Sequence, residues 1–151
     1  MMQFSVKTLV DQPIARVFAG FDQSLFLKLA PPFPPVKLLR FDGCAPQDQV
    51  HLRLSFIFFA QTWESLITAQ HQDTNEIYFI DEGVKLPFFL KKWRHKHRIV
   101  QQDAQSSWII DEISFDTPFW LPRWLLFPSL YAMFAYRKPI YRRYFASKQS
   151  A

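Results

Sequence analysis

The sequence predicts an α+β fold in which a curved antiparallel sheet of about seven strands wraps around a long C-terminal helix. Seven segments alternate between apolar and polar residues with period two, and two others have the three- and four-residue apolar spacing of helices. The composition, 49% hydrophobic with 17 Phe and only 3 Gly, favours large side chains around a substantial enclosed space. Because no linker divides the 151 residues, we expect residues 1–151 to form a single domain.

The chain opens with a predicted strand at residues 3–10, followed by a helix. Asp11 is the expected N-cap of this helix, and Pro13 falls in the first turn, where its missing N–H is harmless. Apolar residues at helical spacing continue to Leu29, with a break expected near residues 22–24. A cluster of prolines then ends the helix.

The middle of the chain predicts six short strands joined by links that are rich in turn-forming residues. Consecutive strands with short links form an antiparallel meander, and the N-terminal strand completes a sheet of about seven. The six strands are expected at about residues 36–41, 49–58, 62–70, 76–82, 91–101 and 107–116.

Residues 120–145 form the longest helical segment, with Leu130, Phe134 and Tyr141 on one face. Three prolines should kink this helix or mark an irregular start. The apolar stretch is too short, too broken by proline and too interrupted by Arg123 for a membrane span. We therefore expect a helix buried against the sheet.

Positive charge is concentrated at the C-terminus, because no acidic residue follows Asp116. We interpret these basic residues as the solvated end of the last helix, where they complement its negative pole. The sequence has no recognition-helix, zinc or base-stacking motif, so no nucleic acid partner is expected. The basic residues concerned are Arg123, Arg137, Lys138, Arg142, Arg143 and Lys148.

The single cysteine, Cys44, excludes an intramolecular disulfide, and we interpret it as an ordinary thiol rather than a nucleophile. The first ten residues alternate like a strand and lack the charged head and apolar run of a signal peptide. A cytoplasmic location is therefore expected.

The strand from Trp93 to Ile99 places two histidines on its inward face. Its outward residues are the cations Arg94, Lys96 and Arg98, whereas Trp93, His95, His97 and Ile99 point inward. On the following strand Asp111 shares the inward side with Ile109, Ile113 and Phe115. Antiparallel pairing of these two strands would bring Asp111 close to His95 or His97, and a buried carboxylate needs such a partner.

Three interpretations of this cluster remain open. It is a satisfied polar network in the core, an anchor for the polar group of a ligand, or a catalytic or metal site. In the catalytic case His95 or His97 acts as general acid or base and Asp111 orients it. Two His and a carboxylate can bind a metal, but the His-x-His spacing is a weak signal, so we expect no metal and no other cofactor.

Aromatic and other apolar side chains supply the remaining candidates. Phe56, Phe58 and Phe88 are also expected in the interior. The residues predicted to contact a ligand are Trp63, Phe79, Phe89, Trp93, His95, His97, Asp111, Phe115, Met133, Phe134 and Tyr141.

The order of elements and four motifs resemble the START and birch-pollen-allergen (SRPBCC) superfamily, whose helix-grip fold wraps a sheet around a C-terminal helix. The match is to its bacterial ligand-binding members with a Trp-x-His-x-His strand. The motifs are Leu29-Ala30-Pro31-Pro32, Trp93-Arg94-His95-Lys96-His97, the strand 111–118 from Asp111 to Pro118, and Phe134-Ala135-Tyr136-Arg137. The resemblance implies a module that binds hydrophobic ligands, but the superfamily also contains cyclases, so the fold does not choose a chemistry.

One segment departs from this pattern. Residues 119–124 are aromatic and proline-rich, whereas the corresponding segment in such proteins is usually glycine-rich. This segment would cap the entrance to a cavity or contact a membrane.

The expected function is binding of a small hydrophobic molecule, lipid-like or aromatic, between the sheet and the last helix, without catalysis. One alternative is an enzyme of the cyclase, dehydratase or hydrolase type that uses His95 or His97 with Asp111. The other is a peripheral lipid-binding protein that makes transient contact with anionic membranes through residues 119–124 and the basic helix end. The sequence does not predict an oligomeric state.

Overall fold

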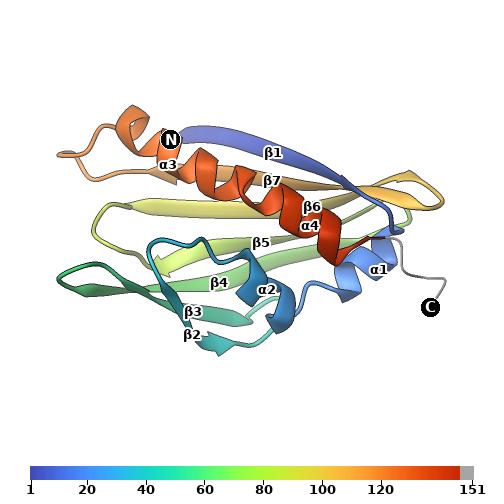
Figure 1. Ribbon diagram of the computed structural model, residues 1–151, viewed down its shortest axis with the longest axis horizontal. Coiled ribbons are helices and arrows are strands. Elements are labelled where there is room, and N and C mark those ends of the chain that lie inside the picture. The colour runs from blue at the N-terminus through green and yellow to red at the C-terminus, as the bar shows by residue number, and fades with distance from the viewer. Residues whose placement is uncertain (147–151) are drawn as a thin grey trace.

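The computed structural model describes residues 1–146 and contains one seven-stranded antiparallel sheet with the order β1-β7-β6-β5-β4-β3-β2. Strands β2 to β7 follow one another as a meander, and β1 returns to pair with β7 (Figure 1). This is the predicted number and order of strands. The strands are β1 Met2–Val10, β2 Val36–Phe41, β3 Gln49–Ser55, β4 Ala60–Gln72, β5 Glu76–Lys85, β6 Lys92–Asp103 and β7 Ser106–Asp116.

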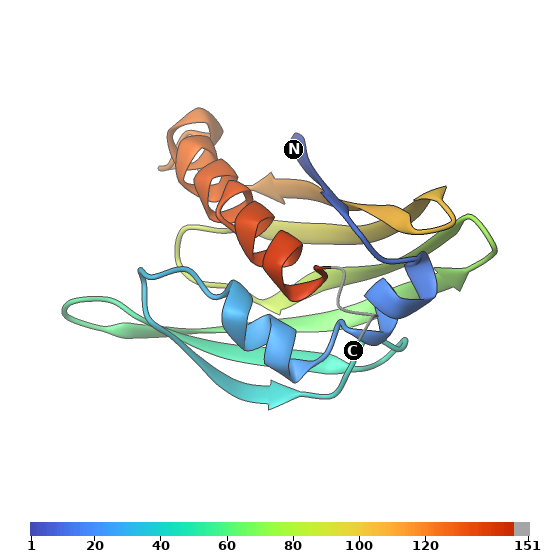
Figure 2. The same cartoon turned by 45° about the vertical axis from the view of Figure 1, so that its right-hand side comes forward.

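Within residues 1–146, four helices cover the concave face of the sheet. Two short helices, α1 (Ile14–Ala19) and α2 (Gln23–Leu29), connect β1 to β2. The C-terminal helix consists of α3 (Arg123–Ala135) and α4 (Arg137–Tyr144), which follow each other across the sheet (Figures 1 and 2). The architecture is therefore the predicted α+β helix-grip arrangement, with a curved sheet around a long C-terminal helix.

Two apolar clusters pack between the sheet and the helices. One contains Ile99 of β6 with Tyr141 of α4, and the other contains Trp93 of β6 with Phe134 of α3. His95 and His97 lie on β6 between Trp93 and Ile99, so the strand carries a polar section from one cluster to the other.

Most predicted elements of the N-terminal half are confirmed. Val6, Thr8 and Val10 are buried on one side of β1, as the alternation predicts. The first helix breaks just before Asp22, whose Oδ1 accepts the N–H of Leu25 at 3.0 Å and caps α2.

The predicted N-cap at Asp11 is wrong. Helix α1 begins after Pro13, without a side-chain cap, and Asp11 is exposed. Gln12 follows Asp11 and is buried instead, because its Nε2 donates to the carbonyl of Ala146 at 3.2 Å and ties the helix start to the C-terminal segment.

The prediction that Phe58 and Phe88 lie in the interior is also wrong. Strand β3 ends at Ser55 rather than continuing to Phe58, and the loop beyond it leaves Phe58 92% exposed. Phe88 lies in the β5–β6 loop and is exposed. Both loops extend past the sheet, where no helix covers them (Figure 1).

The C-terminal helix is confirmed, but two details differ. Its apolar stripe is buried from Leu130 onward, whereas Leu125 in the first turn is exposed because this turn lies beyond the packed part of the sheet. Arg137, predicted as part of a solvated basic end, is largely buried, with 13% of its side chain exposed. Lys148 lies outside the described residues. Among residues 1–146, no helix is long and apolar enough to cross a membrane.

Candidate functional site

A cavity of about 180 Å³ lies between the concave face of the sheet and the helices α2 and α3. This is larger than the engineered cavity of about 150 Å³ that holds benzene in another protein. Most of its lining is apolar. The predicted contact residues that line it are Trp63, Phe79, Phe89, Trp93, His95, His97, Met133 and Phe134.

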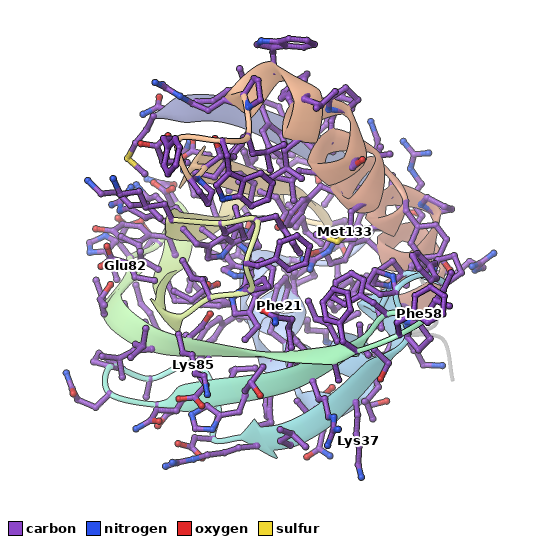
Figure 3. All side chains as sticks on the ribbon, turned by 90° about the vertical axis from the view of Figure 1, so that its left-hand side faces the viewer. Phe21, Lys37, Phe58, Glu82, Lys85 and Met133 are labelled. Atoms are coloured by element: carbon purple, nitrogen blue, oxygen red, sulfur yellow. The ribbon has the colours of Figure 1, made fainter. Side chains whose placement is uncertain are left out.

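Asp111, Phe115 and Tyr141 are fully buried, but they are not part of the lining. They lie behind it and support the residues that do line the cavity, as the bond from His95 to Asp111 shows. Figure 3 looks into the fold from its end and shows Met133 and Phe21 lying between the helix and the sheet. The lining also includes residues that were not predicted, among them Phe26, Leu29, Pro31 and Pro34 around α2.

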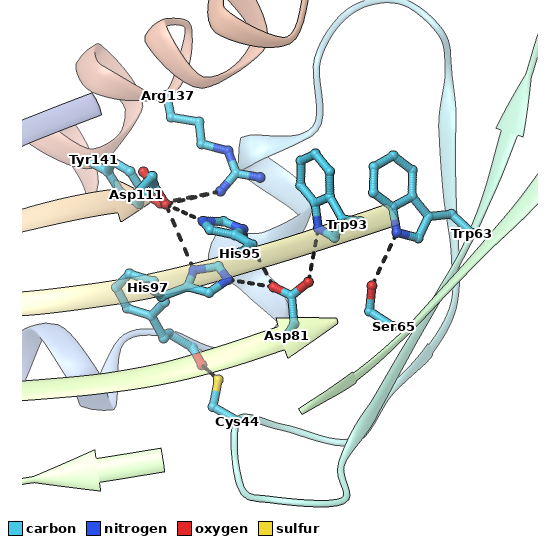
Figure 4. A network of polar contacts seen from close by, with 11 residues as sticks. Cys44, Trp63, Ser65, Asp81, Trp93, His95, His97, Asp111, Arg137 and Tyr141 are labelled. Carbon is cyan, nitrogen blue, oxygen red and sulfur yellow. Dashed lines mark hydrogen bonds and ion pairs between the residues drawn. The ribbon is translucent and has the colours of Figure 1, made fainter. Parts of the chain in front are cut away.

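The polar part of the cavity consists of two crossed His–Asp pairs. His95 Nε2 lies 2.8 Å from Asp111 Oδ1, and His97 Nε2 lies 2.8 Å from Asp81 Oδ2 (Figure 4). In the sheet register, however, His95 lies opposite Asp81 and His97 lies opposite Asp111. Each histidine therefore bonds the carboxylate diagonal to it, and the two rings stack with centroids 3.5 Å apart.

Asp81 of β5 is the centre of a second set of contacts. Its Oδ1 accepts the indole N–H of Trp93 at 3.2 Å, while its Oδ2 lies 3.5 Å from Nδ1 of His95 as well as bonding His97. Asp81, His95 and His97 all line the cavity. A ligand in the cavity would therefore meet this group directly.

Arg137, the first residue of α4, brings a positive charge to the same region. Its Nη1 lies 3.8 Å from Asp111 Oδ1 and donates to the hydroxyl of Tyr141 at 3.5 Å. Its guanidinium also lies over the ring of Phe134. The Nε of Arg137 is buried and has no hydrogen-bond partner among residues 1–146, although Arg137 lines the cavity.

Both carboxyl groups are ionised in the fold. Burial raises the pKa of Asp81, but the hydrogen bond from His97, the nearby imidazoles and the Trp93 N–H outweigh it and bring the pKa below its ordinary value. Burial likewise raises the pKa of Asp111, but the hydrogen bond from His95 and the positive charge of Arg137 outweigh burial and bring the pKa below its ordinary value. An ionised carboxylate only accepts, so Nε2 carries the proton in both histidines.

His95 is held in its neutral form near pH 7. Burial and the neighbouring His97 lower the pKa of His95 to about 4, although Asp111 and Asp81 oppose the shift. Because Nε2 donates to Asp111, Nδ1 of His95 is the ring's acceptor and faces Asp81. The tautomer is thus fixed by the carboxylate behind the ring.

Asp81, His95 and His97 offer donor atoms within 4.8 Å of one another, a set that binds divalent metals in many proteins. Both oxygens of Asp81 are already engaged, since Oδ1 accepts the N–H of Trp93 at 3.2 Å and Oδ2 accepts the N–H of His97 at 2.8 Å. A metal would have to replace one of these bonds and separate the two stacked rings. The arrangement therefore favours a hydrogen-bonded network over a metal centre.

Cys44 and Ser65 also contribute polar atoms to the lining. The thiol of Cys44 donates to the carbonyl of Phe21 at 3.6 Å, and burial raises its pKa to about 12, which favours an ordinary thiol. The hydroxyl of Ser65 accepts the indole N–H of Trp63 at 3.1 Å.

Sequence reasoning missed two members of the site. Asp81 shares its parity on β5 with the buried Ile77 and Phe79, so alternation alone could have placed it on the inward face. Arg137 follows Phe134 by three residues and therefore lies on the buried stripe of the helix.

No protein-family description and no curated protein matches the sequence. Solved structures do match it over nearly its whole length. Protein XoxI from Bacillus cereus is 14% identical with a TM-score of 0.67, covering 96% of each chain. A norcoclaurine synthase mutant from Thalictrum flavum, solved with a transition-state analogue, is 9% identical with a TM-score of 0.64, covering 93% of each chain.

A START superfamily protein from Mycobacterium smegmatis is 12% identical with a TM-score of 0.63, covering 88% of this chain and 91% of the other. At such identities the likeness concerns the fold. It confirms the helix-grip fold that the sequence motifs predict, and one of the matched structures is that of an enzyme, so the fold alone does not choose a function.

Proposed function

We propose that the chain binds one small, largely apolar molecule in the cavity between the sheet and α3. The observation that carries this proposal is the cavity itself, which is walled mostly by apolar side chains and includes the clustered polar groups of Asp81, His95, His97 and Arg137. Ligand sites in proteins typically combine such a wall with a few convergent polar groups. The fold shared with a START superfamily protein supports the same class of function.

The wall favours a ligand with a flat ring. Trp63 and Trp93 meet edge to face at a centroid distance of 4.9 Å, and the ring of Phe79 stacks on His97 at 4.2 Å. A planar ligand can extend such stacks, because aromatic rings attract one another at these spacings.

The polar side of the cavity favours a ligand that carries a hydrogen-bond acceptor. Arg137 presents a buried Nε–H without a partner among the described residues, and an unpaired buried donor costs free energy until an acceptor reaches it. Asp81 and Asp111 are both ionised and already accept hydrogen bonds from Trp93, His97 and His95. A carbonyl, phenol or carboxylate oxygen would thus be anchored at Arg137.

The direct test is native mass spectrometry of the protein purified under gentle conditions, followed by organic extraction. The expected result is a small molecule, apolar apart from an oxygen-containing group, that leaves on denaturation. An interior that is always empty, and that takes up no aromatic probe, would contradict the proposal.

A second candidate function is proton-transfer catalysis, favoured by the His95–Asp111 pair beside the cavity. The carboxylate holds the proton on Nε2 and leaves Nδ1 as the acceptor beside Asp81, which is the orientation of a general base, but a pKa of about 4 makes it a weak base near pH 7. One matched fold is that of norcoclaurine synthase.

The two functions are separated by the His95→Asn variant. Molecules extracted from wild-type and variant protein after expression in the same cells are compared by mass. Identical molecules support binding alone, whereas accumulation of a different molecule in the variant supports turnover.

A further inference from the structure

Large apolar side chains protrude from one end of the molecule, where three loops meet. These are the β3–β4, β5–β6 and β7–α3 loops, which lie together at the left of Figure 1. Phe119 is 100% exposed, Phe58 is 92% exposed and Trp124 is 68% exposed. We call this surface the aromatic tip, and it consists of Ile57, Phe58, Phe59, Phe88, Phe119, Trp120 and Trp124.

The loops contact each other through their rings. Phe59 lies 5.6 Å from Phe88, and Phe88 stacks on Trp120 at 6.1 Å, which joins all three loops. The tip is therefore one continuous surface rather than scattered side chains. Exposed apolar surfaces of this kind mark sites of interaction.

The aromatic tip also continues into the cavity wall. Phe88 meets Phe89 edge to face at 5.2 Å, and Phe89 lines the cavity. Helix α3 makes a second connection, because its first turn carries Trp124 and its third carries Met133, which lines the cavity. The tip thus adjoins the site proposed to hold an apolar ligand.

Charge around the tip is positive. Residues 84–92 contain Lys85, Lys91 and Lys92 and no acidic residue, and residues 55–60 contain no charge at all. These three lysines are exposed and make no ion pair within residues 1–146. Arg123 lies at the start of α3, where it pairs with Asp116 at 3.2 Å.

We propose that the aromatic tip docks on an anionic lipid bilayer, with its rings at the head-group level and the lysines of the β5–β6 region against the lipid phosphates. Phe and Trp side chains with neighbouring Lys match the membrane interface, where apolar rings insert and cations meet negative lipids. The rings stand out from three loops rather than forming a groove, which suits a fluid surface.

The proposed surface differs from the one expected from the sequence in the source of its positive charge. The basic residues of α4 lie at the opposite end of the C-terminal helix from residues 119–124 (Figure 1). The positive charge at the tip comes from the β5–β6 region instead. The proposal does not depend on ligand binding, since docking and the cavity are measured separately.

The test is co-sedimentation with vesicles of phosphatidylcholine alone or mixed with phosphatidylserine. Wild-type protein is expected to sediment with the anionic vesicles at low salt and to be released as salt rises. The Phe58→Ser/Phe119→Ser variant should bind about tenfold more weakly, since it removes the two most exposed rings. The Lys91→Gln/Lys92→Gln variant should lose most of the preference for phosphatidylserine.

The matched control is Leu27→Ser/Leu39→Ser, which removes two exposed leucines from α2 and β2, away from the tip. It is expected to sediment like wild type. Absence of sedimentation at low salt, or equal losses in the tip and control variants, would overturn the proposal. A dimer in solution that the tip variant abolishes, with no vesicle binding, would overturn it in favour of self-association.

Discussion

His95 donates to Asp111 across a 2.8 Å contact, although the residue directly opposite His95 on β7 is Ile113. The diagonal contact is within the reach of an imidazole across neighbouring strands. It leaves Asp111 1% exposed and His95 3% exposed, with the carboxylate behind the ring and the ring at the cavity. The polar group that faces a ligand is therefore oriented from within the core.

The Asp111→Asn substitution should destabilise the protein by about 3 kcal/mol, because it removes the charged partner of a buried donor and of Arg137. Urea unfolding at neutral pH measures the effect. The control is Glu112→Gln, which breaks a surface ion pair with Arg98 and should cost less than about 1 kcal/mol. Equal losses of unfolding free energy in the two variants would show that the buried contacts of Asp111 stabilise the fold no more than a surface ion pair does.

Stability should fall as the pH drops from 6.5 toward 4. The pKa of His95 is lowered to about 4, so in this interval the unfolded chain binds a proton that the folded protein does not. The stability that the fold gains by keeping His95 neutral is fully present above pH 6.5 and is on the order of 3 kcal/mol. Asp81 and Asp111, with lowered pKa values, extend the loss to more acidic pH because they must be protonated there.

Urea midpoints measured across this pH range test the assignment to His95. The His95→Gln variant should lose less stability between pH 6.5 and 4 than wild type, whatever its stability at neutral pH. The exposed Arg142 of α4 provides a control, and Arg142→Gln should leave the pH dependence between pH 6.5 and 4 unchanged, because arginine does not titrate there. A wild-type slope in His95→Gln would assign the pH dependence to other groups.

Arg137→Lys should weaken binding of an acceptor-bearing ligand more than binding of an uncharged one. A lysine has no Nε–H at this position and does not reproduce the planar donor set of the guanidinium. We expect about tenfold weaker binding of anilinonaphthalene sulfonate, with a much smaller change for N-phenylnaphthylamine. Arg142→Lys, at an exposed position of α4, should change neither affinity. Equal changes for both probes would show that Arg137 does not anchor the polar group.

The sequence predicts the fold well because its strands carry their pattern locally. The pairing of Trp93 with Phe115 and of Ile99 with Ile109 is the register expected from alternation and a short turn, and it places Asp111 beside the histidines as predicted. A shift of the pairing by one residue would turn the apolar side chains of a strand to the opposite face, so the alternation permits only one register.

Other features depend on contacts between distant residues and were not predicted. Asp81 joins the site because β5 pairs with β6. Arg137 is buried because the carboxylate of Asp111, 3.8 Å away, compensates its positive charge. Phe58 lies outside because β3 ends early, and alternation does not show where a sheet ends.

Filling the cavity tests the central claim most directly. The Met133→Trp variant places a large ring in the space between α3 and the sheet, whereas Ala132→Trp adds the same ring at an exposed position of the same helix. Fluorescence titration with N-phenylnaphthylamine is the measurement, with unfolding in urea to show that both variants fold. We predict about tenfold weaker binding for Met133→Trp and unchanged binding for Ala132→Trp. Wild-type affinity in a folded Met133→Trp variant would contradict the account, because the probe would then bind outside the cavity.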